Sequence, residues 1–217
     1  MAYRLRDGLS CCILGGRTIF LDVAADRYFC CPSSVDGDLR RIIAGEEVEA
    51  SEQIDWLIRH RVIRSVTGQQ VPIPASACPA ASESSIGLDK KWLRAGSLWG
   101  LIRDQLHMKR RLGQRRLDDI LSELGNIRPD LNQEDRAVAL AGARAARITD
   151  WWWSRNDRCL VKSLALTRFL FRSGCPASLV IGVRQDPFTA HCWVQHGGLV
   201  LNDEIDQVRK FTPIFVL

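Results

Sequence analysis

The feature that most constrains this chain is the run over residues 156–203, where a cysteine, a histidine and an aspartate stand at junctions between helical and strand-like patterns. Cys159 begins a stretch whose apolar residues recur at helical spacing, and Gly174 ends it. His191 lies in a later alternating run, and Asp203 follows the next apolar run. Cys, His and Asp in this order are the parts of a cysteine nucleophile, its base and the residue that orients the base.

The start of the predicted helix favours a reactive thiol. Asn156 or Asp157 is suited to cap the helix, which places Cys159 in its first turn. Free backbone N–H groups and the positive end of the helix dipole stabilise a thiolate at such a position. The same N–H groups are placed to stabilise an oxyanion.

Two further strands are predicted to bring the histidine and the aspartate together. Strands are expected over residues 177–183, 189–195 and 199–201, with a Gly197-Gly198 turn between the last two. Alternation puts Cys192 and Val194 on one face and His191, Trp193 and Gln195 on the other. The returning strand then places Asp203 within reach of the His191 ring, and Trp193 beside that ring.

Two other interpretations of these residues remain. A buried cysteine and a histidine are often structural rather than catalytic. A metal site is the second interpretation, with a ligand set of Cys159, Cys175, His191, Cys192 and His196. That set lacks the usual ligand spacings, and the adjacent His191 and Cys192 point to opposite faces of a strand, so no metal is predicted.

Composition limits the class of protein. The chain has 217 residues, 46% of them hydrophobic, and no run of about 18 apolar residues that would span a membrane. Its polar beginning is unlike a secretory signal, so the eight cysteines are expected to be reduced in a cytoplasmic protein. The net charge of +5 permits an acidic peptide or a nucleic acid as partner and selects neither.

The chain is predicted to hold two α+β units. Residues 1–66 show strand patterns at 3–7, 10–14, 18–23 and 27–31, a Gly15-Gly16 turn, and two short helices, the second capped by Ser51. Residues 67–87 are rich in Pro, Ala and Ser and are interpreted as a linker. Residues 88–217 form the second unit, with helical patterns that include residues 117–124 and 133–153.

Several features have no assigned role. Cys11, Cys12, Cys30 and Cys31 are interpreted as buried strand cysteines, with a metal or redox role as the alternative. The basic stretch around Arg110 is interpreted as a solvated helix end, with contact to a peptide, an enzyme or a nucleic acid as the alternative. The Trp151-Trp152-Trp153 run is expected either to pack or to line the cleft. No phosphate loop of the GxxxxGK type is present.

The last part of the chain resembles the protease domain of lasso-peptide B proteins. The resemblance rests on C-L-x-x-S-x-A-L from Cys159, then L-V-I-G-V-R-x-x-P-F-x-A-H-x-W-V, then G-G-x-V-x-N-D. It implies a transglutaminase-like (papain-related) fold in which Cys159, His191 and Asp203 are nucleophile, base and orienter. It also implies the removal of a leader from a ribosomally made precursor peptide.

Residues 1–66 resemble, more weakly, the winged-helix-like precursor-recognition element of the same proteins. That element holds the leader as an added strand, in which main-chain bonds give affinity and side-chain pockets give selectivity. The resemblance places the strand beside residues 27–31 and the groove wall on the following helix. The implied leader-binding residues are Arg27, Tyr28, Phe29, Cys30, Gln53, Trp56, Leu57 and His60. A role in the core is the other interpretation for each of them.

The resemblance also implies partners. These are the lasso precursor peptide and an ATP-using, asparagine-synthetase-like cyclase, while this chain itself is expected to bind no cofactor and no membrane. Three alternatives remain: acyl transfer to an amine by the same triad, a non-catalytic peptide-binding module, and a winged-helix reader of nucleic acid. The acidic and neutral residues at the start of the helix over residues 51–61 disfavour the last of these.

Overall fold

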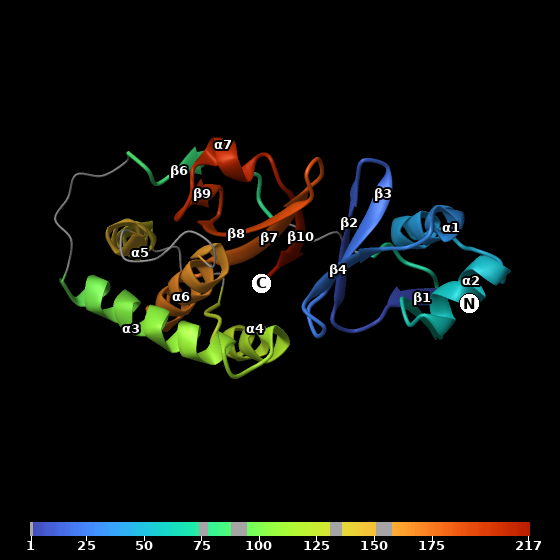
Figure 1. Ribbon diagram of the computed structural model, residues 1–217, viewed down its shortest axis with the longest axis horizontal. Coiled ribbons are helices and arrows are strands. Elements are labelled where there is room, and N and C mark those ends of the chain that lie inside the picture. Colours follow the sequence, from blue (N-terminus) through green and yellow to red (C-terminus); the bar gives the residue numbers. More distant parts are fainter. Residues whose placement is uncertain (1, 74–77, 88–94, 131–135, 151–157) are drawn as a thin grey trace. The chain divides into compact units, whose positions relative to one another are not determined.

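The computed structural model describes residues 2–73, 78–87, 95–130, 136–150 and 158–217. The chain divides into two compact units, Met1–Ala77 and Cys78–Leu217, whose elements are labelled in Figure 1. Strands and helices occur together in each unit, which confirms the α+β class. Among the described residues, no helix combines the length and the apolar character that a membrane span requires.

Unit 1 (Met1–Ala77) is built on two antiparallel sheets. One has the strand order β2-β3-β4, and the other pairs β1 with β5. The bounds are β1 Ala2–Leu5, β2 Leu9–Leu14, β3 Arg17–Asp22, β4 Arg27–Cys30 and β5 Ile63–Val66. Gly15 and Gly16 turn the chain between β2 and β3 with φ angles of 58° and 75°, which glycine adopts without strain. The four strands predicted first along the chain are thereby confirmed, with small shifts at their ends.

The core of unit 1 forms where two helices, α1 (Ser33–Ala44) and α2 (Glu52–Arg59), pack on these strands. The Ser51 hydroxyl accepts the N–H of Ile54 at 3.3 Å, which confirms the predicted cap of α2. Removing large apolar side chains from water is the main stabilising term here. Side chains with no exposed surface come from a strand and from both helices: Phe20, Leu39, Ile42 and Leu57.

The paired cysteines of unit 1 are not all buried. Cys12 and Cys31 are buried and Cys11 is half-buried, but Cys30 is exposed because β4 ends its sheet. The expectation of buried cysteines was therefore wrong for Cys30. Cys12 and Cys30 stand on either side of Ile19 in the strand register, which separates them by two strand spacings, about 9 to 10 Å. A disulfide does not reach that far, and no described cysteine forms one.

The stretch predicted as a linker, residues 67–87, is attached to both units in its described parts. Gln70 donates to the carbonyls of Tyr3 and Ile42 at 3.3 and 3.1 Å and accepts the Tyr3 N–H at 2.7 Å. The N–H of Ile73 donates to the Ile43 carbonyl at 2.9 Å. These bonds extend unit 1 beyond residue 66, so the predicted boundaries 1–66 and 67–87 need correction.

The other end of that stretch belongs to unit 2 (Cys78–Leu217). Strand β6 (Glu83–Ser84) pairs in parallel with β9 (Leu199–Val200). The hydroxyl of the buried Ser85 donates to the Leu201 carbonyl at 2.9 Å. Unit 2 therefore begins before residue 88. A composition rich in Pro, Ala and Ser gave no sign of these main-chain bonds.

Unit 2 has one five-stranded sheet, with the order β10-β7-β8-β9-β6. Its other strands are β7 Ser178–Arg184, β8 Thr189–His196 and β10 Thr212–Val216, and its helices are α3 Ala95–Leu112, α4 Leu117–Asn126, α5 Arg136–Thr149, α6 Arg158–Arg172 and α7 Ile205–Val208. Helix α6 is central, since it contacts β7 and β8 as well as α3, α4 and α5 (Figure 1). Its buried side chains include Leu164, Ala165, Leu166 and Leu170. The ends of the predicted helix over 133–153 lie outside the described residues.

We expect Gly45→Ala to destabilise unit 1. Gly45 ends α1 at a φ of 85°, and a Cβ there would lie 2.5 Å from the Pro72 nitrogen. A left-handed conformation costs a residue with a side chain about 1–2 kcal/mol, and the contact with Pro72 adds to this. Urea denaturation followed by circular dichroism measures the loss.

The matched control is Gly37→Ala in the same helix. A Cβ at Gly37 has nothing within 4 Å, so alanine should be neutral or raise the free energy of unfolding by up to about 1 kcal/mol. Equal effects of the two substitutions would contradict the role given to Gly45.

Candidate active site

The structure brings the three residues singled out in the sequence to one place in unit 2. Cys159 lies in the first turn of α6, His191 lies near the start of β8, and Asp203 follows β9. The Asp203 Oδ2 and the His191 Nε2 are 2.5 Å apart, and a hydrogen bond joins the same ring to the Cys159 thiol. Because Asp203 takes Nε2, the ring presents Nδ1 to the sulfur.

The His191 ring is set up to carry a charge. Burial disfavours that charge, but hydrogen bonds and charges from Asp203 and Cys159 outweigh burial and raise the pKa of His191 to about 9. The side chains of His191 and Asp203 are each 21% exposed, so water screens the pair only in part. His191 is therefore an imidazolium at neutral pH.

The surroundings of Cys159 favour its thiolate form and so complement that cation. Burial alone would raise its pKa, but the hydrogen bond and charge of His191 lower it, and so do the backbone N–H groups of Cys192 and Leu160. Leu160 supplies a first-turn amide of α6, as the sequence predicted for a helix start. The proposed caps Asn156 and Asp157 lie outside the described residues, as does the run of tryptophans at 151–153.

Two aromatic rings hold His191 in place. The Trp193 ring centroid is 6.1 Å from that of His191, so the prediction that Trp193 lies beside the imidazole is confirmed. Phe211, after α7, comes closer, at 5.1 Å. Gly182 lies opposite His191 in the strand register, and a Cβ there would lie 2.8 and 2.9 Å from the Trp193 and Phe211 side chains. No motif marks Phe211 in the sequence, so sequence reasoning missed it.

The residues proposed to bind a leader all lie in unit 1. Four are on β4, which has one strand neighbour, β3, among the described residues: Arg27, Tyr28, Phe29 and Cys30. The other four lie on α2 or at its end: Gln53, Trp56, Leu57 and His60. The Trp56 and His60 rings stack with centroids 3.8 Å apart, whereas Leu57 is fully buried. Leu57 is therefore a core residue, and its place in a groove wall needs correction.

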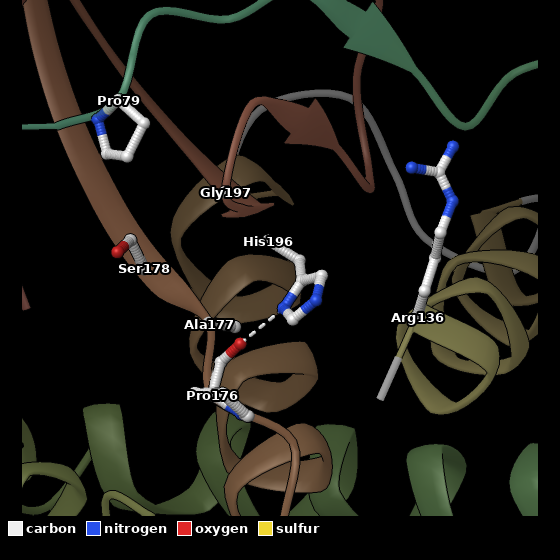
Figure 2. Close-up of a pocket in the computed structure, with 7 residues that line it drawn as sticks. All are labelled: Pro79, Arg136, Pro176, Ala177, Ser178, His196 and Gly197. Carbon is white, nitrogen blue, oxygen red and sulfur yellow. Dashed lines mark hydrogen bonds between the residues drawn. The ribbon is translucent and has the colours of Figure 1, made fainter. Parts of the chain in front are cut away.

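The five residues of the alternative metal set do not gather at one point. Cys159, His191 and Cys192 lie at the site described above. His196 is five residues farther along β8 than His191, or about 16 Å at strand spacing. Figure 2 shows its Nδ1 donating to the Pro176 carbonyl at 2.6 Å, beside a cavity of about 400 Å³. Cys175 lies 3.9 Å from the same Nδ1, so this pair is a separate feature.

The basic stretch around Arg110 is partly neutralised where the structure describes its neighbours. Arg111 pairs with Glu123, and Arg116 pairs with Asp118 at 3.3 Å. Such ion pairs at a helix end reduce the positive charge available to a nucleic acid.

Comparison with known proteins identifies a family for this chain. The family described as the transglutaminase-like superfamily matches residues 104–216, more than half of the chain. A stretch of 56 residues is 53% identical to the microcin J25-processing protein McjB of Escherichia coli. That stretch covers 26% of this chain and 27% of McjB, and it confirms the resemblance to lasso-peptide B proteins. No solved structure gives a significant match.

We expect iodoacetamide to label Cys159 well below the pH at which an ordinary thiol reacts. A lowered pKa keeps the thiolate as pH falls, so labelling should persist at pH 7 and decline only when pH falls through the lowered value. Burial raises the pKa of Cys12, Cys31 and Cys78 to about 11, so these thiols should react slowly. Peptide mass spectrometry across a pH series measures each site, with the exposed Cys30 as reference.

The control is His191→Gln. It removes the cation and leaves only the two backbone N–H groups to oppose burial, so the pKa of Cys159 should rise and labelling at pH 7 should fall by about tenfold for each unit of that rise. An unchanged pH profile in His191→Gln would show that the thiolate does not depend on the imidazolium.

Proposed function

The chain belongs to the transglutaminase-like superfamily, and we propose that it is a cysteine peptidase that removes the leader from a ribosomally made lasso precursor. The observation that carries the proposal is the Cys159 thiol at the start of α6, hydrogen-bonded to an imidazole that Asp203 holds at 2.5 Å. Similarity to a protein named for processing microcin J25 supports the substrate class.

The proposed reaction has two stages, acylation of Cys159 and hydrolysis of the resulting thioester, and His191 transfers a proton in both. The Cys159 thiolate attacks the scissile carbonyl, and the N–H of Leu160 lies beside the sulfur where an oxyanion would form. The C–N bond breaks as the His191 Nδ1 gives its proton to the leaving amine of the core peptide. Neutral His191 then takes a proton from water, whose oxygen attacks the thioester and releases the leader as a carboxylate. Asp203 keeps the ring oriented throughout.

Unit 1 is proposed to be the winged-helix-like element that captures the leader. Its strand β4 stands at the end of the sheet β2-β3-β4, where an extended peptide can add by main-chain hydrogen bonds. Arg27 lies 5.5 Å from the Phe29 ring centroid and 3.6 Å from the Asp22 carboxylate, which fixes a cation beside that edge. Gln53, Trp56 and His60 of the α2 region are proposed to supply side-chain contacts.

The proposed partner is an ATP-using cyclase of the asparagine-synthetase type. Cleavage leaves a free amine at the start of the core peptide, and ring closure on that amine needs an activated carboxyl group. Hydrolysis of a peptide bond by the triad needs neither ATP nor a metal, so the proposed reaction requires no cofactor in this chain.

We expect the protein to cut a synthetic lasso precursor into two fragments, with Cys159→Ala giving none. Cys175→Ala is the matched control, because Cys175 is another cysteine of unit 2 but lies beside His196, away from the triad. Mass spectrometry separates the outcomes. An amine adduct would mean acyl transfer, and an unchanged but retained peptide would mean a binding module.

The cleavage rate should also report on the two other triad residues. It should fall as pH rises through about 9, because His191 then lacks the proton that the leaving amine requires. Asp203→Asn should lower kcat by roughly two to three orders of magnitude, less than in a serine protease because a thiol ionises more readily. A kcat for Asp203→Asn within about twofold of wild type would remove Asp203 from the mechanism.

We expect leader binding to depend on the outer edge of β4. Successive N–H groups of a strand point to opposite edges, so Phe29→Pro and Cys30→Pro form a matched pair. One variant removes a donor facing β3 and should destabilise unit 1. The other removes a donor facing outward and should keep the fold while weakening leader binding by at least about tenfold. Fluorescence anisotropy with a labelled leader measures affinity, and circular dichroism checks folding; a folded pair with undiminished affinity would exclude this edge.

A further inference from the structure

A second set of polar groups runs beside the triad in unit 2. Ser163 follows Cys159 by one turn of α6, and Asn202 directly precedes Asp203. The carbonyl of Cys192 directly follows His191 along β8. Each triad residue therefore has a neighbour in this second set, which is formed by the Ser163 hydroxyl, the Cys192 carbonyl and the Asn202 amide.

Hydrogen bonds join the members of this set. The Ser163 hydroxyl donates to the Cys192 carbonyl at 2.9 Å and accepts from the Asn202 Nδ2 at 2.9 Å. The Asn202 Oδ1 in turn accepts the Val194 N–H at 2.8 Å. Ser163 has no exposed surface, and its hydroxyl uses its single donor and one of its two acceptor lone pairs in these bonds. The set thus ties α6, β8 and the segment after β9 into one buried network.

The network lies along the edge of β8 that faces away from β7, beyond the part that β9 covers among the described residues. Strand β9 pairs with β8 only at Gln195 and His196, so the earlier residues of that edge need other partners. The N–H of Cys192 bonds to the Cys159 sulfur, and its carbonyl bonds to Ser163. Cys192 therefore bonds to the Cys159 sulfur through its backbone N–H and to Ser163 of the network through its backbone carbonyl.

We propose that Ser163 and Asn202 are positioning residues, which fix the separation of Cys159 from His191 by locking α6 and the Asp203 segment to the free edge of β8. The proposal rests on the proposed role of Cys159 as nucleophile. Loss of either side chain leaves buried polar partners unpaired, and α6 can then shift along the edge. Displacement of a catalytic group by about 1 Å is enough to cost roughly a hundredfold in rate.

Thr167 provides a matched control one turn farther along α6. It is also fully buried, and its hydroxyl bonds only within the helix, to the Ser163 backbone carbonyl at 2.8 Å. Thr167→Val removes that hydroxyl while keeping the shape of the side chain. Ser163→Ala removes a buried hydroxyl from the same helical face, but one that reaches β8. The two variants therefore separate the loss of a buried hydroxyl from the loss of the network.

The test is the pH profile of Cys159 alkylation by iodoacetamide in the full chain, with melting temperature measured beside it. Ser163→Ala and Asn202→Ala should shift the profile to higher pH and slow labelling at pH 7 by at least about tenfold, since the thiolate fraction falls tenfold per unit. Thr167→Val should lower the melting temperature and leave the profile unchanged. Ser163→Thr keeps the hydroxyl, so its labelling profile should match that of the wild type.

The double variant Ser163→Ala/Asn202→Ala should react no more slowly than the slower single variant, because both substitutions break one network. Asn202 is half-buried, so Asn202→Ala decides the question if Ser163→Ala does not fold. A folded Asn202→Ala with the wild-type profile, or an equal shift in Thr167→Val, would overturn the proposal.

Iodoacetamide labelling of Cys159 needs no peptide substrate, so the test remains valid even if the protein does not cleave a leader. Conversely, slow labelling of Cys159 in the unsubstituted protein would count against the nucleophile itself, and hence against the proposed function, rather than against the two positioning residues.

Discussion

The site depends on one constraint: among the described residues no strand covers the edge of β8 beyond the point where β9 stops, and side chains from α6 bond there instead. Buried main-chain groups must find partners, and here the partners are Cys159, Ser163 and Asn202. The side-chain bonds that satisfy the main chain at this edge of β8 are thus the same bonds that locate the nucleophile. Stability and reactivity are coupled at this edge, so the site cannot loosen without exposing unpaired polar groups.

The charge pattern of the site follows from that geometry. Cys159 is held at a helix start beside two amides, while His191 receives a carboxylate on its other ring nitrogen. Each half of the resulting ion pair is stabilised by groups outside the pair. The thiolate form of Cys159 is therefore favoured by the protein itself, before any substrate arrives.

The sequence predicted what depends on local pattern. Apolar spacing located α6, β7 and β8, and the residue types at their junctions indicated Cys159, His191 and Asp203. Contacts made by single side chains to distant main chain were beyond reach. Gln70 binding Tyr3 across 67 residues, and Ser85 binding Leu201, have no periodic signature, which is why the linker and the domain boundaries needed correction. Phe211 and the full burial of Leu57 depend likewise on packing that no spacing reveals.

Asn202 and Asp203 make the segment after β9 sensitive to length. Asn202 bonds to the β8 backbone and Asp203 bonds to the His191 imidazole, so two consecutive residues each have a different, fixed partner. Inserting or deleting one residue here would move both at once and deliver a carboxylate where an amide belongs. The position of the exposed Glu204 that follows is not constrained in this way. Insertions and deletions between Leu201 and Asp203 should therefore not be tolerated, even where substitutions on the surrounding surface are.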